Sequence, residues 1–447
     1  MERSKFNIDA IVVGAGPAGV SAALTLKRAG RNVVVLERSD MAGTKNMFGG
    51  AVYLNSVKSL FPKTFSEAPY ERFIVHRTYS FLNSSGSVDI KSSSLADNTA
   101  ATVFRPKFDN WMVQQAKAEG VFFAPKTLVK KLIYKNGSVV GVKTEQEKYF
   151  APIVILADGV NSLLSKDIGL RKEFFPKDMV LAVRETYKLD KKTIEERFSL
   201  EEGSREGAMY EFFGGLSGFY LTEKKKKRPV TPFAIGFLYT FKDTVSLGLG
   251  ISLEDLTLYK MKPYEVLEKF KSHPVVKRLI AGGAESEYSA HMIPEFGYNH
   301  LPKLYANGVM VVGDAAGLIN SAHFEGTNFA IESGRLAGET AIIALNLNKF
   351  RFNVLKTYEE KLRRSFVLKD MKSYRNVVET LYSRKNSILK YYPDKMGELM
   401  ETIHVVDNVD KKRKFRKFFK TVFFERSILE LFRDFKAFLK LFFEIMF

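Results

Sequence analysis

DAIVVGAGPAG, residues 9–19, is the stretch that decides the fold, and RNVVVLE, residues 31–37, completes it. The apolar run before the glycines predicts a buried parallel strand, and the glycines permit a tight turn, close approach of backbone to a pyrophosphate and close helix packing. A helix over 18–28 then presents open amides to phosphate charge. The second apolar run delivers Glu37, whose carboxylate can accept hydrogen bonds from ribose hydroxyls. An ordinary strand–turn–helix explains the glycines alone, but strand, spacing and acid together predict FAD.

The composition limits the chemistry that this chain can perform. Its 447 residues suffice for two or three domains and include no cysteine. The chain therefore cannot form disulfides, use a thiolate nucleophile or hold an iron–sulfur cluster by its own thiolates. Any cluster must be carried by another subunit. The charged segment over residues 1–9 does not resemble a cleavable secretory signal, so we expect a cytosol-facing protein.

The net charge of +19 is concentrated toward the C-terminus, because residues 411–447 contain eleven Lys or Arg and four Asp or Glu. No groove-reading or RNA-binding signature accompanies this charge, so no nucleic-acid partner is expected. The basic run 224–228 is interpreted as a solvated loop. No uncharged apolar run reaches the roughly 18 residues that a membrane-spanning helix needs.

Two further apolar strands end at acidic residues, in APIVILADGVNS at 151–162 and GVMVVGDAAG at 308–317. Because ligands bind at the carboxyl ends of the strands in a doubly wound sheet, Glu37, Asp158 and Asp314 should converge on one cofactor. We expect Asp314 to bind a ribityl hydroxyl and Asp158 to brace the strand end or the pyrophosphate loop. Helix capping is the alternative role for Asp158 and Asp314.

A helix of about twenty residues is predicted to begin at Gly326. Its open amides would stabilise the negative charge of a reduced flavin and raise the flavin potential. His323 lies just before this helix and could donate to a quinone carbonyl or to the flavin edge. The alternative is that His323 is only a local hydrogen-bond partner.

The last residues predict an amphipathic helix with a basic polar face. Such a helix suits the interface of an anionic bilayer, although docking on the globule or on a partner subunit is the alternative. Its apolar stripe consists of Ile428, Leu431, Phe432, Phe435, Phe438, Leu439, Phe442 and Met446.

The order of the predicted elements indicates an α/β protein in which a Rossmann-type FAD-binding domain carries an inserted antiparallel sheet. The expected parts are a discontinuous FAD-binding domain (1–50, 99–170 and 290–345), an antiparallel-sheet substrate or acceptor domain (51–98 and 171–289), a helical region (346–410) and a basic amphipathic tail (411–447).

Several motifs together resemble the FAD-dependent, glutathione-reductase-type superfamily. They are the glycine motif with Glu37, RPKFDNW at 105–111, ADG at 157–159 and GDAAG at 313–317. Three segments narrow the resemblance: KNMFGG at 45–50, MIPEFG at 292–297 and FEGTNFA at 324–330. These look like the FixC flavoproteins and the electron transfer flavoprotein:quinone oxidoreductases, over nearly the whole chain. The quinone oxidoreductases carry their own cysteine-bound cluster, so the cysteine-free chain is more similar to the FixC type.

The resemblance implies a peripheral flavoprotein on the cytoplasmic side of the cell membrane. It would take electrons from an electron transfer flavoprotein and pass them through FAD to quinone, with a separate ferredoxin-like iron–sulfur subunit. The leading alternative is an FAD-dependent reductase of geranylgeranyl or other isoprenoid lipids. No catalytic side chain and no metal are expected, because the flavin supplies the redox chemistry.

The resemblance further places Arg105 beside the FAD pyrophosphate or the isoalloxazine edge, and the backbone of Val129 against adenine. Possible flavin-edge residues are Lys45, Asn46 and His323. The expected cofactor-binding residues are Gly14, Gly16, Pro17, Ala18, Gly19, Glu37, Arg38, Gly49, Gly50, Arg105, Val129, Asp158, Gly313, Asp314, Gly326, Thr327 and Asn328.

Overall fold

The computed structural model describes residues 7–44, 49–95, 99–173, 175–216, 218–223, 226–295 and 297–446. The chain forms two compact units, each of which is assembled from three separate segments. The cofactor unit contains Met1–Phe73, Asn98–Val180 and His291–Arg375, and the sheet unit contains Ile74–Asp97, Leu181–Ala290 and Asn376–Phe447. The predicted α/β fold with a Rossmann-type part, an antiparallel sheet and helical C-terminal residues is confirmed.

The cofactor unit is built on a sheet of order β19-β20-β11-β1-β2-β7. The pairs among β20, β11, β1, β2 and β7 are parallel, and β19 adds an antiparallel edge. The apolar runs form strands because β1, β2, β11 and β20 are buried along their whole length. The bounds are β1 (Ala10–Val13), β2 (Val33–Leu36), β7 (Phe122–Ala124), β11 (Ile153–Leu156), β19 (Tyr305–Ala306) and β20 (Val309–Val311).

Helix α1 (Pro17–Arg28) packs closely on α9 (Thr327–Leu347). A Cβ atom on Gly334 would lie 2.1 Å from the carbonyl oxygen of Ala18. The hydroxyl of Ser21 donates to the Ile331 carbonyl over 2.6 Å. The helix predicted to start near Gly326 is therefore present, and its side toward α1 admits only small residues.

The sequence predicts a hairpin with strands near 126–134 and 139–143 and a turn at Asn136-Gly137. A hairpin does follow α3 (Arg105–Ala118), but its first strand begins at Lys131. Strand β8 (Lys131–Lys135) pairs with β9 (Ser138–Lys143), and β10 (Lys148–Phe150) extends this sheet. Lys126 has a φ of 54° and donates its N–H to the Ser39 carbonyl, so this stretch follows the end of β2 instead of pairing with β9.

Residues 51–73 and 346–375 lie with the cofactor unit, which differs from the expected boundaries. Val52 and Val57 are buried in the same core as β1, and the hydroxyl of Tyr358 donates to the Val311 carbonyl over 3.0 Å. The other elements of this unit are β3 (Gly49–Tyr53), α2 (Leu54–Leu60), η1 (Phe65–Glu67), β6 (Ala100–Phe104), α4 (Leu163–Asp167), η2 (Pro176–Asp178), η3 (Tyr298–His300), η4 (Gly313–Ala316), α10 (Phe352–Arg364) and α11 (Phe366–Ser373).

The sheet unit is organised around strands in the order β18-β12-β17-β16-β13-β4, with β5 paired to β4. The helices of this unit pack on the sheet. The core between them contains Phe212, Leu247 and Phe270. The strands are β4 (Tyr70–Leu82), β5 (Ser87–Ser93), β12 (Met179–Lys188), β13 (Glu206–Gly214), β16 (Ala234–Thr240), β17 (Thr244–Ser252) and β18 (Ala284–Pro294), and the helices are α5 (Lys191–Phe198), α6 (Leu253–Leu258), α7 (Pro263–Lys271) and α8 (Pro274–Leu279). Strands β4, β12 and β18 each run from one unit into the other.

The basic run 224–228 is not wholly a loop. Strand β14 (Phe219–Glu223) pairs with β15 (Lys226–Val230) in an antiparallel ladder, so residues 226–228 of the basic run lie in a strand. Lys224 and Lys225 lie outside the described residues.

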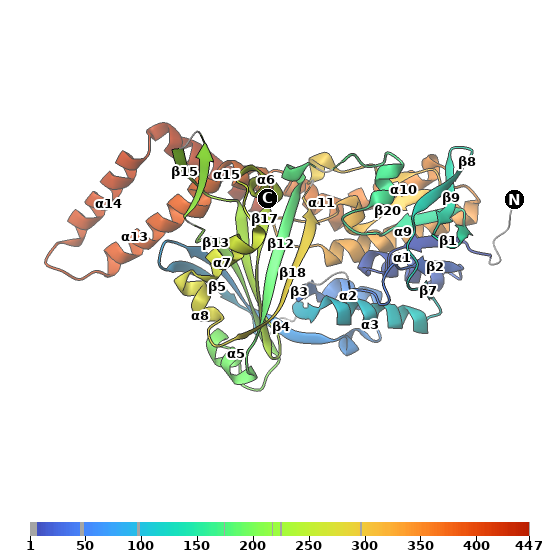
Figure 1. Cartoon of the computed structure of the whole chain (residues 1–447), viewed down its shortest axis with the longest axis horizontal. Helices are drawn as coiled ribbons and strands as arrows, with labels where there is room; N and C mark the ends of the chain where they lie inside the picture. The colour runs from blue at the N-terminus through green and yellow to red at the C-terminus, as the bar shows by residue number, and fades with distance from the viewer. Residues whose placement is uncertain are drawn as a thin grey trace. The chain divides into compact units, whose positions relative to one another are not determined.

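The C-terminal residues form five helical segments that belong to the sheet unit. They are α12 (Val377–Ser383), the π-helical segment η5 (Ser387–Tyr391), α13 (Tyr392–His404), α14 (Lys411–Glu425) and α15 (Ile428–Met446). Helices α13 and α14 form the projecting hairpin drawn in red in Figure 1. Among the described residues, no helix is both long enough and apolar enough to cross a bilayer.

Candidate cofactor site

In the turn after β1, backbone contacts leave no room for a side chain at two of the three glycines. A Cβ on Gly14, whose φ is +103°, would lie 2.2 Å from the Ala157 carbonyl oxygen. A Cβ on Gly19 would lie 2.0 Å from the Gly14 carbonyl oxygen. A Cβ on Gly16 would meet no atom of the described residues within 4 Å. Gly14 and Gly19 are therefore required by the fold, whereas Gly16 borders the space that a pyrophosphate would need.

Glu37 follows β2 and is held by the turn itself. Its Oε2 accepts the Ala15 amide and its Oε1 accepts the Ser39 amide, each over 2.9 Å. Each carboxylate oxygen can accept a further hydrogen bond. Glu37 is therefore oriented before any ligand binds, and ribose hydroxyls would find acceptors already in place.

Arg105 begins α3 and makes a two-pronged ion pair with Asp109 one turn later. The distances are 2.7 Å from Nε to Oδ1 and 2.9 Å from Nη2 to Oδ2. Asp109 is buried, so the pair fixes the guanidinium in a bidentate geometry. Burial lowers the pKa of Arg105, but the negative charges of Asp109 and of Asp314 in η4 raise it by more.

His291 is a member of this cluster that the sequence did not reveal. Burial lowers its pKa, Asp314 opposes that shift, and Arg105 and Arg38 reinforce it. Burial raises the pKa of Asp314, while His291 and Arg105 lower it. The imidazole lies near the end of β18 without a motif around it, so only its position just before MIPEFG could have drawn attention to it.

Asp158 follows β11 and precedes the short helix α4. Burial raises its pKa to about 6, while hydrogen bonds from Ser162 and the Leu164 backbone oppose the shift. These bonds tie Asp158 to the turn before α4, whose N-cap residue is Ser162. Its Oδ1 is buried and has no hydrogen-bond partner among the described residues, so this acceptor would be available to a ligand.

The N-terminus of α9 also offers unused polar groups. Gly326 is the N-cap residue, and no side chain of the described residues caps the helix. Asn328 donates from Nδ2 to Oε2 of Glu325 over 3.4 Å, and its buried Oδ1 has no partner within the described part of the chain. Gly313, with a φ of +58°, brings the GDAAG turn close to α1, where its Cβ would lie 3.0 Å from that of Ala18.

The structure gives fewer contacts for the other residues that were predicted to bind the cofactor. Val129 is buried in the stretch that follows Glu37 and Ser39, as an adenine contact would require. Gly50 lies in β3, and a Cβ on it would meet nothing within 4 Å. Gly49 is also in β3, whereas Lys45 and Asn46 lie outside the described residues.

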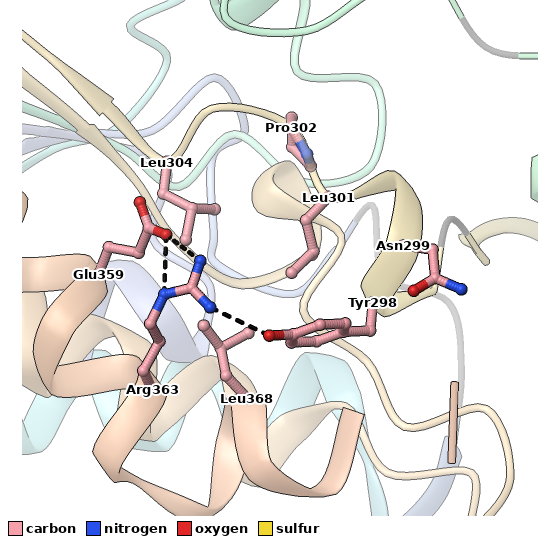
Figure 2. Close-up of a pocket in the computed structure, with 8 residues that line it drawn as sticks. All are labelled: Tyr298, Asn299, Leu301, Pro302, Leu304, Glu359, Arg363 and Leu368. Atoms are coloured by element: carbon pink, nitrogen blue, oxygen red, sulfur yellow. Dashed lines mark hydrogen bonds and ion pairs between the residues drawn. The ribbon is translucent and has the colours of Figure 1, made fainter. Parts of the chain in front are cut away.

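A small pocket lies on another part of the cofactor unit (Figure 2). Its volume is about 200 Å³, and Arg363 crosses it with bonds to Glu359 and to the Tyr298 hydroxyl, the latter over 3.0 Å. None of the predicted cofactor residues lines it. The lining consists of Tyr298, Asn299, Leu301, Pro302, Leu304, Glu359, Arg363 and Leu368.

The open side of Gly16, the pre-oriented Glu37 and the spare acceptors of Asp158 and Asn328 fit a flavin dinucleotide. When bound, FAD supplies the acceptance and release of electrons, and the chain supplies binding and electrostatics. These features define the class of the protein as a Rossmann-type FAD-dependent oxidoreductase.

Comparison with known proteins agrees with this class. The family described as FAD dependent oxidoreductase matches residues 9–162, and the ETF-QO/FixC family C-terminal domain matches residues 378–442. Protein FixC of Azorhizobium caulinodans is 37% identical over 435 residues, which cover 95% of this chain and 97% of that protein. The probable electron transfer flavoprotein-quinone oxidoreductase YdiS of Escherichia coli is 35% identical, with 91% and 92% coverage. The chain belongs to the FixC and electron transfer flavoprotein-quinone oxidoreductase family.

Solved structures show the same fold at low sequence identity. A geranylgeranyl bacteriochlorophyll reductase-like protein of Thermoplasma acidophilum is 19% identical, with a TM-score of 0.68 and coverage of 91% of this chain and 94% of that one. The flavin-dependent brominase Bmp2 is 15% identical, with a TM-score of 0.62 and 92% coverage of both chains. FAD is the cofactor of this family, as the sequence predicted.

Proposed function

We propose that this chain takes electrons from an electron transfer flavoprotein and passes them through FAD to quinone at the cytoplasmic side of the cell membrane. A separate ferredoxin-like subunit carries the iron–sulfur cluster. The similarity to a relative named as a probable electron transfer flavoprotein-quinone oxidoreductase, over 91% of this chain, is the observation that carries the proposal. The absence of cysteine supports a cluster held by another chain.

A test of the route uses the purified flavoprotein with its co-purifying chains. We expect reduced electron transfer flavoprotein to reduce a quinone analogue when this protein is present. Hydrogenation of a geranylgeranyl lipid without quinone reduction would instead establish the isoprenoid reductase alternative. Identification of the co-purifying chains tests the ferredoxin-like partner, and its absence from a fully active preparation would contradict that part.

The C-terminal helices support attachment to a membrane surface. No described residue of α14 is buried, and Phe423 and Phe424 are 63% and 79% exposed. The same helix begins with the basic run from Lys411 to Lys414. Exposed phenylalanines beside lysine and arginine suit the interface of an anionic bilayer.

Helix α15 contacts the sheet unit with residues that lie outside its predicted apolar stripe. Most of its predicted apolar stripe is exposed, whereas Asp434 and Leu441 are only 1% and 7% exposed. Asp434 accepts hydrogen bonds from the Ser387 and Tyr392 hydroxyls, each over 3.0 Å, and pairs with Arg426. The helix therefore docks on the sheet unit through Asp434. Phe438 packs against Tyr392, whereas Phe432, Phe435 and Phe442 remain more than half exposed.

This docking determines how the membrane attachment should be tested. Deletion of residues 411–447 would also remove the buried Asp434, so loss of binding would be ambiguous. We expect the double substitution Phe423→Ser and Phe424→Ser to abolish flotation with anionic vesicles while thermal unfolding is unchanged. Leu258→Ser, at an exposed position of α6 in the same unit, is the matched control. Unaltered flotation of the double variant would rule out α14 as the attachment surface.

A further inference from the structure

The turn that leads into α9 is unusually constrained. Asn320 and Glu325 form an antiparallel bridge whose two backbone hydrogen bonds measure 2.9 and 3.1 Å. Phe324, inside the turn, has a φ of 54°, a region that bulky residues rarely adopt. Strain of this kind persists where the surrounding structure holds it, and it is concentrated at functional sites.

Titratable side chains gather around this turn. The ring of His323 packs edge-on against Tyr374, with 4.7 Å between the ring centroids. Asp370 of α11 acts on both Glu325 and Tyr374 and is itself influenced by His323 and Lys369. The cluster thus consists of two carboxyls, an imidazole and a phenol from two elements of the cofactor unit, with Lys369 as the neighbouring cation.

The pKa of each of the two carboxyls is raised above its ordinary value. Burial raises the pKa of Glu325, and Asp370 adds to the shift, while Asn328, His323 and Asn320 oppose it. Burial likewise raises the pKa of Asp370, against His323 and Lys369. A carboxyl whose pKa is raised keeps its proton to a higher pH than a free carboxyl does, and a protonated carboxyl can act as a proton donor.

Asn328 connects the cluster to the N-terminus of α9. It is 8% exposed, its Nδ2 donates to Glu325, and its Oδ1 has no partner within the described ranges. An unpaired buried acceptor indicates a missing donor, such as a ligand N–H or O–H group. The carboxyl of Glu325 therefore accepts a hydrogen bond from a side chain whose Oδ1 is available to a ligand.

We propose that Glu325 is the proton donor for quinone reduction, with Asp370 and His323 as positioning residues that reload it from solvent. This inference rests on the proposed electron route to quinone. Two-electron reduction adds two electrons and two protons to a quinone, and both carbonyl oxygens become hydroxyls. The electrons come from the electron transfer flavoprotein, and the protons come from solvent. Glu325 gives its O–H proton to one quinone oxygen, becomes a carboxylate, and is reprotonated from the Asp370 side.

The test compares Glu325→Gln and Asp370→Asn with wild type, using two electron acceptors. Ferricenium takes an electron without a proton, whereas a water-soluble quinone analogue needs protons. We expect Glu325→Gln to lower the steady-state rate with quinone by about 100-fold, the usual scale of a lost general acid, and to leave the ferricenium rate unchanged. Asp370→Asn should shift the pH profile of the quinone reaction and leave that of ferricenium unchanged.

Glu339→Gln is the matched control, because Glu339 lies on α9 but pairs with Arg335 and Lys361 outside the cluster. A readout independent of turnover is the infrared C=O band of protonated carboxyls, followed by pH titration of the holoprotein. Glu325→Gln should remove one titrating band that Glu339→Gln retains.

The possible outcomes distinguish the proton-donor role of Glu325 from the electron route on which it rests. A wild-type rate and pH profile with quinone in Glu325→Gln would overturn the proton donor and leave the electron route intact. Failure of the wild-type protein to reduce any quinone, with normal ferricenium reduction, would overturn the electron route and the donor together. Equal losses with both acceptors would assign Glu325 to cofactor binding and overturn its role as donor.

Discussion

The glycine turn and the C-terminal helices show two different ways in which sequence determines structure. In the turn, Gly14 and Gly19 leave no room for a side chain, so backbone contacts alone determine which residue is allowed. In α15, many residues could form the same helix, and the single buried carboxylate of Asp434 determines which face docks. A motif of close contacts can be read without a structure, whereas a docking face cannot.

The largest expected effect would come from filling the turn. Gly14→Ala places a methyl group against the Ala157 carbonyl oxygen at a φ of +103°, so we expect a loss of about 5 kcal/mol or more in the free energy of unfolding, with no flavin bound. Gly16→Ala is the control, since its Cβ meets open space. It should leave the apoprotein stable but weaken FAD binding. Denaturant unfolding of the apoprotein and flavin absorbance measure the two effects, and equal stability of both variants would refute the contrast.

The next effect concerns the anchor of α15. Asp434→Ala would leave Arg426 and the Ser387 and Tyr392 hydroxyls without their acceptor. Removing one partner of a buried ion pair typically costs about 3–5 kcal/mol. Chemical denaturation should show this loss, while Lys436→Ala on the exposed side of α15 should change stability by less than about 0.5 kcal/mol. Similar values for both would show that α15 is not docked through Asp434.

We expect a smaller effect, which depends on pH, at Glu211, a carboxyl that is stabilised by its neighbours less fully than Asp434 is. Burial raises the pKa of Glu211, on β13, to about 7, and Arg77 opposes the shift only partly. The folded protein then binds a proton that the unfolded chain releases above its pKa of about 4.3, so this group's contribution to stability is present at low pH and is lost as pH rises toward 7. The wild-type free energy of unfolding should fall relative to that of Glu211→Gln by on the order of 1–3 kcal/mol between pH 4 and 8. A difference that is constant over this range would contradict the raised pKa.

The smallest effect on stability should follow changes on the exposed surface of α14. Phe419→Ser should alter the unfolding midpoint hardly at all, because its side chain is already half exposed. Vesicle binding should nevertheless weaken, since each exposed phenylalanine contributes apolar area at the bilayer interface. A clear loss of thermal stability would show instead that α14 packs against protein.

Much of the fold could be predicted because its signals are local. The apolar runs that became β1, β2, β11 and β20, and the spacing from the glycines to Glu37, describe one supersecondary unit at a time. The hairpin of β16 and β17 was predictable from alternation and a short turn for the same reason. Strand β8 began later than predicted because the backbone of Lys126 bonds to Ser39, a residue far away in the sequence.

The candidate site was predictable only where a motif marks it. Arg105 and Asp314 belong to recognisable sequence motifs. His291, which interacts electrostatically with both of them, does not. The cluster around Glu325 likewise needs Asp370 and Tyr374, which come from α11 and its end, well after the motif. Such groupings depend on how helices pack, which leaves no trace at any fixed spacing along the chain.

By itself, the sequence determined that a dinucleotide cradle exists, that the cofactor is FAD and that this chain cannot ligate an iron–sulfur cluster through cysteine. These conclusions follow from residues whose chemistry acts within a few positions, or from a residue type that is missing. Only the tertiary structure decided which unit each segment joins, which face of α15 is buried and which acids surround Glu325. The reason is physical: burial and partner choice are properties of contacts between distant segments, and they come into existence only when the chain packs.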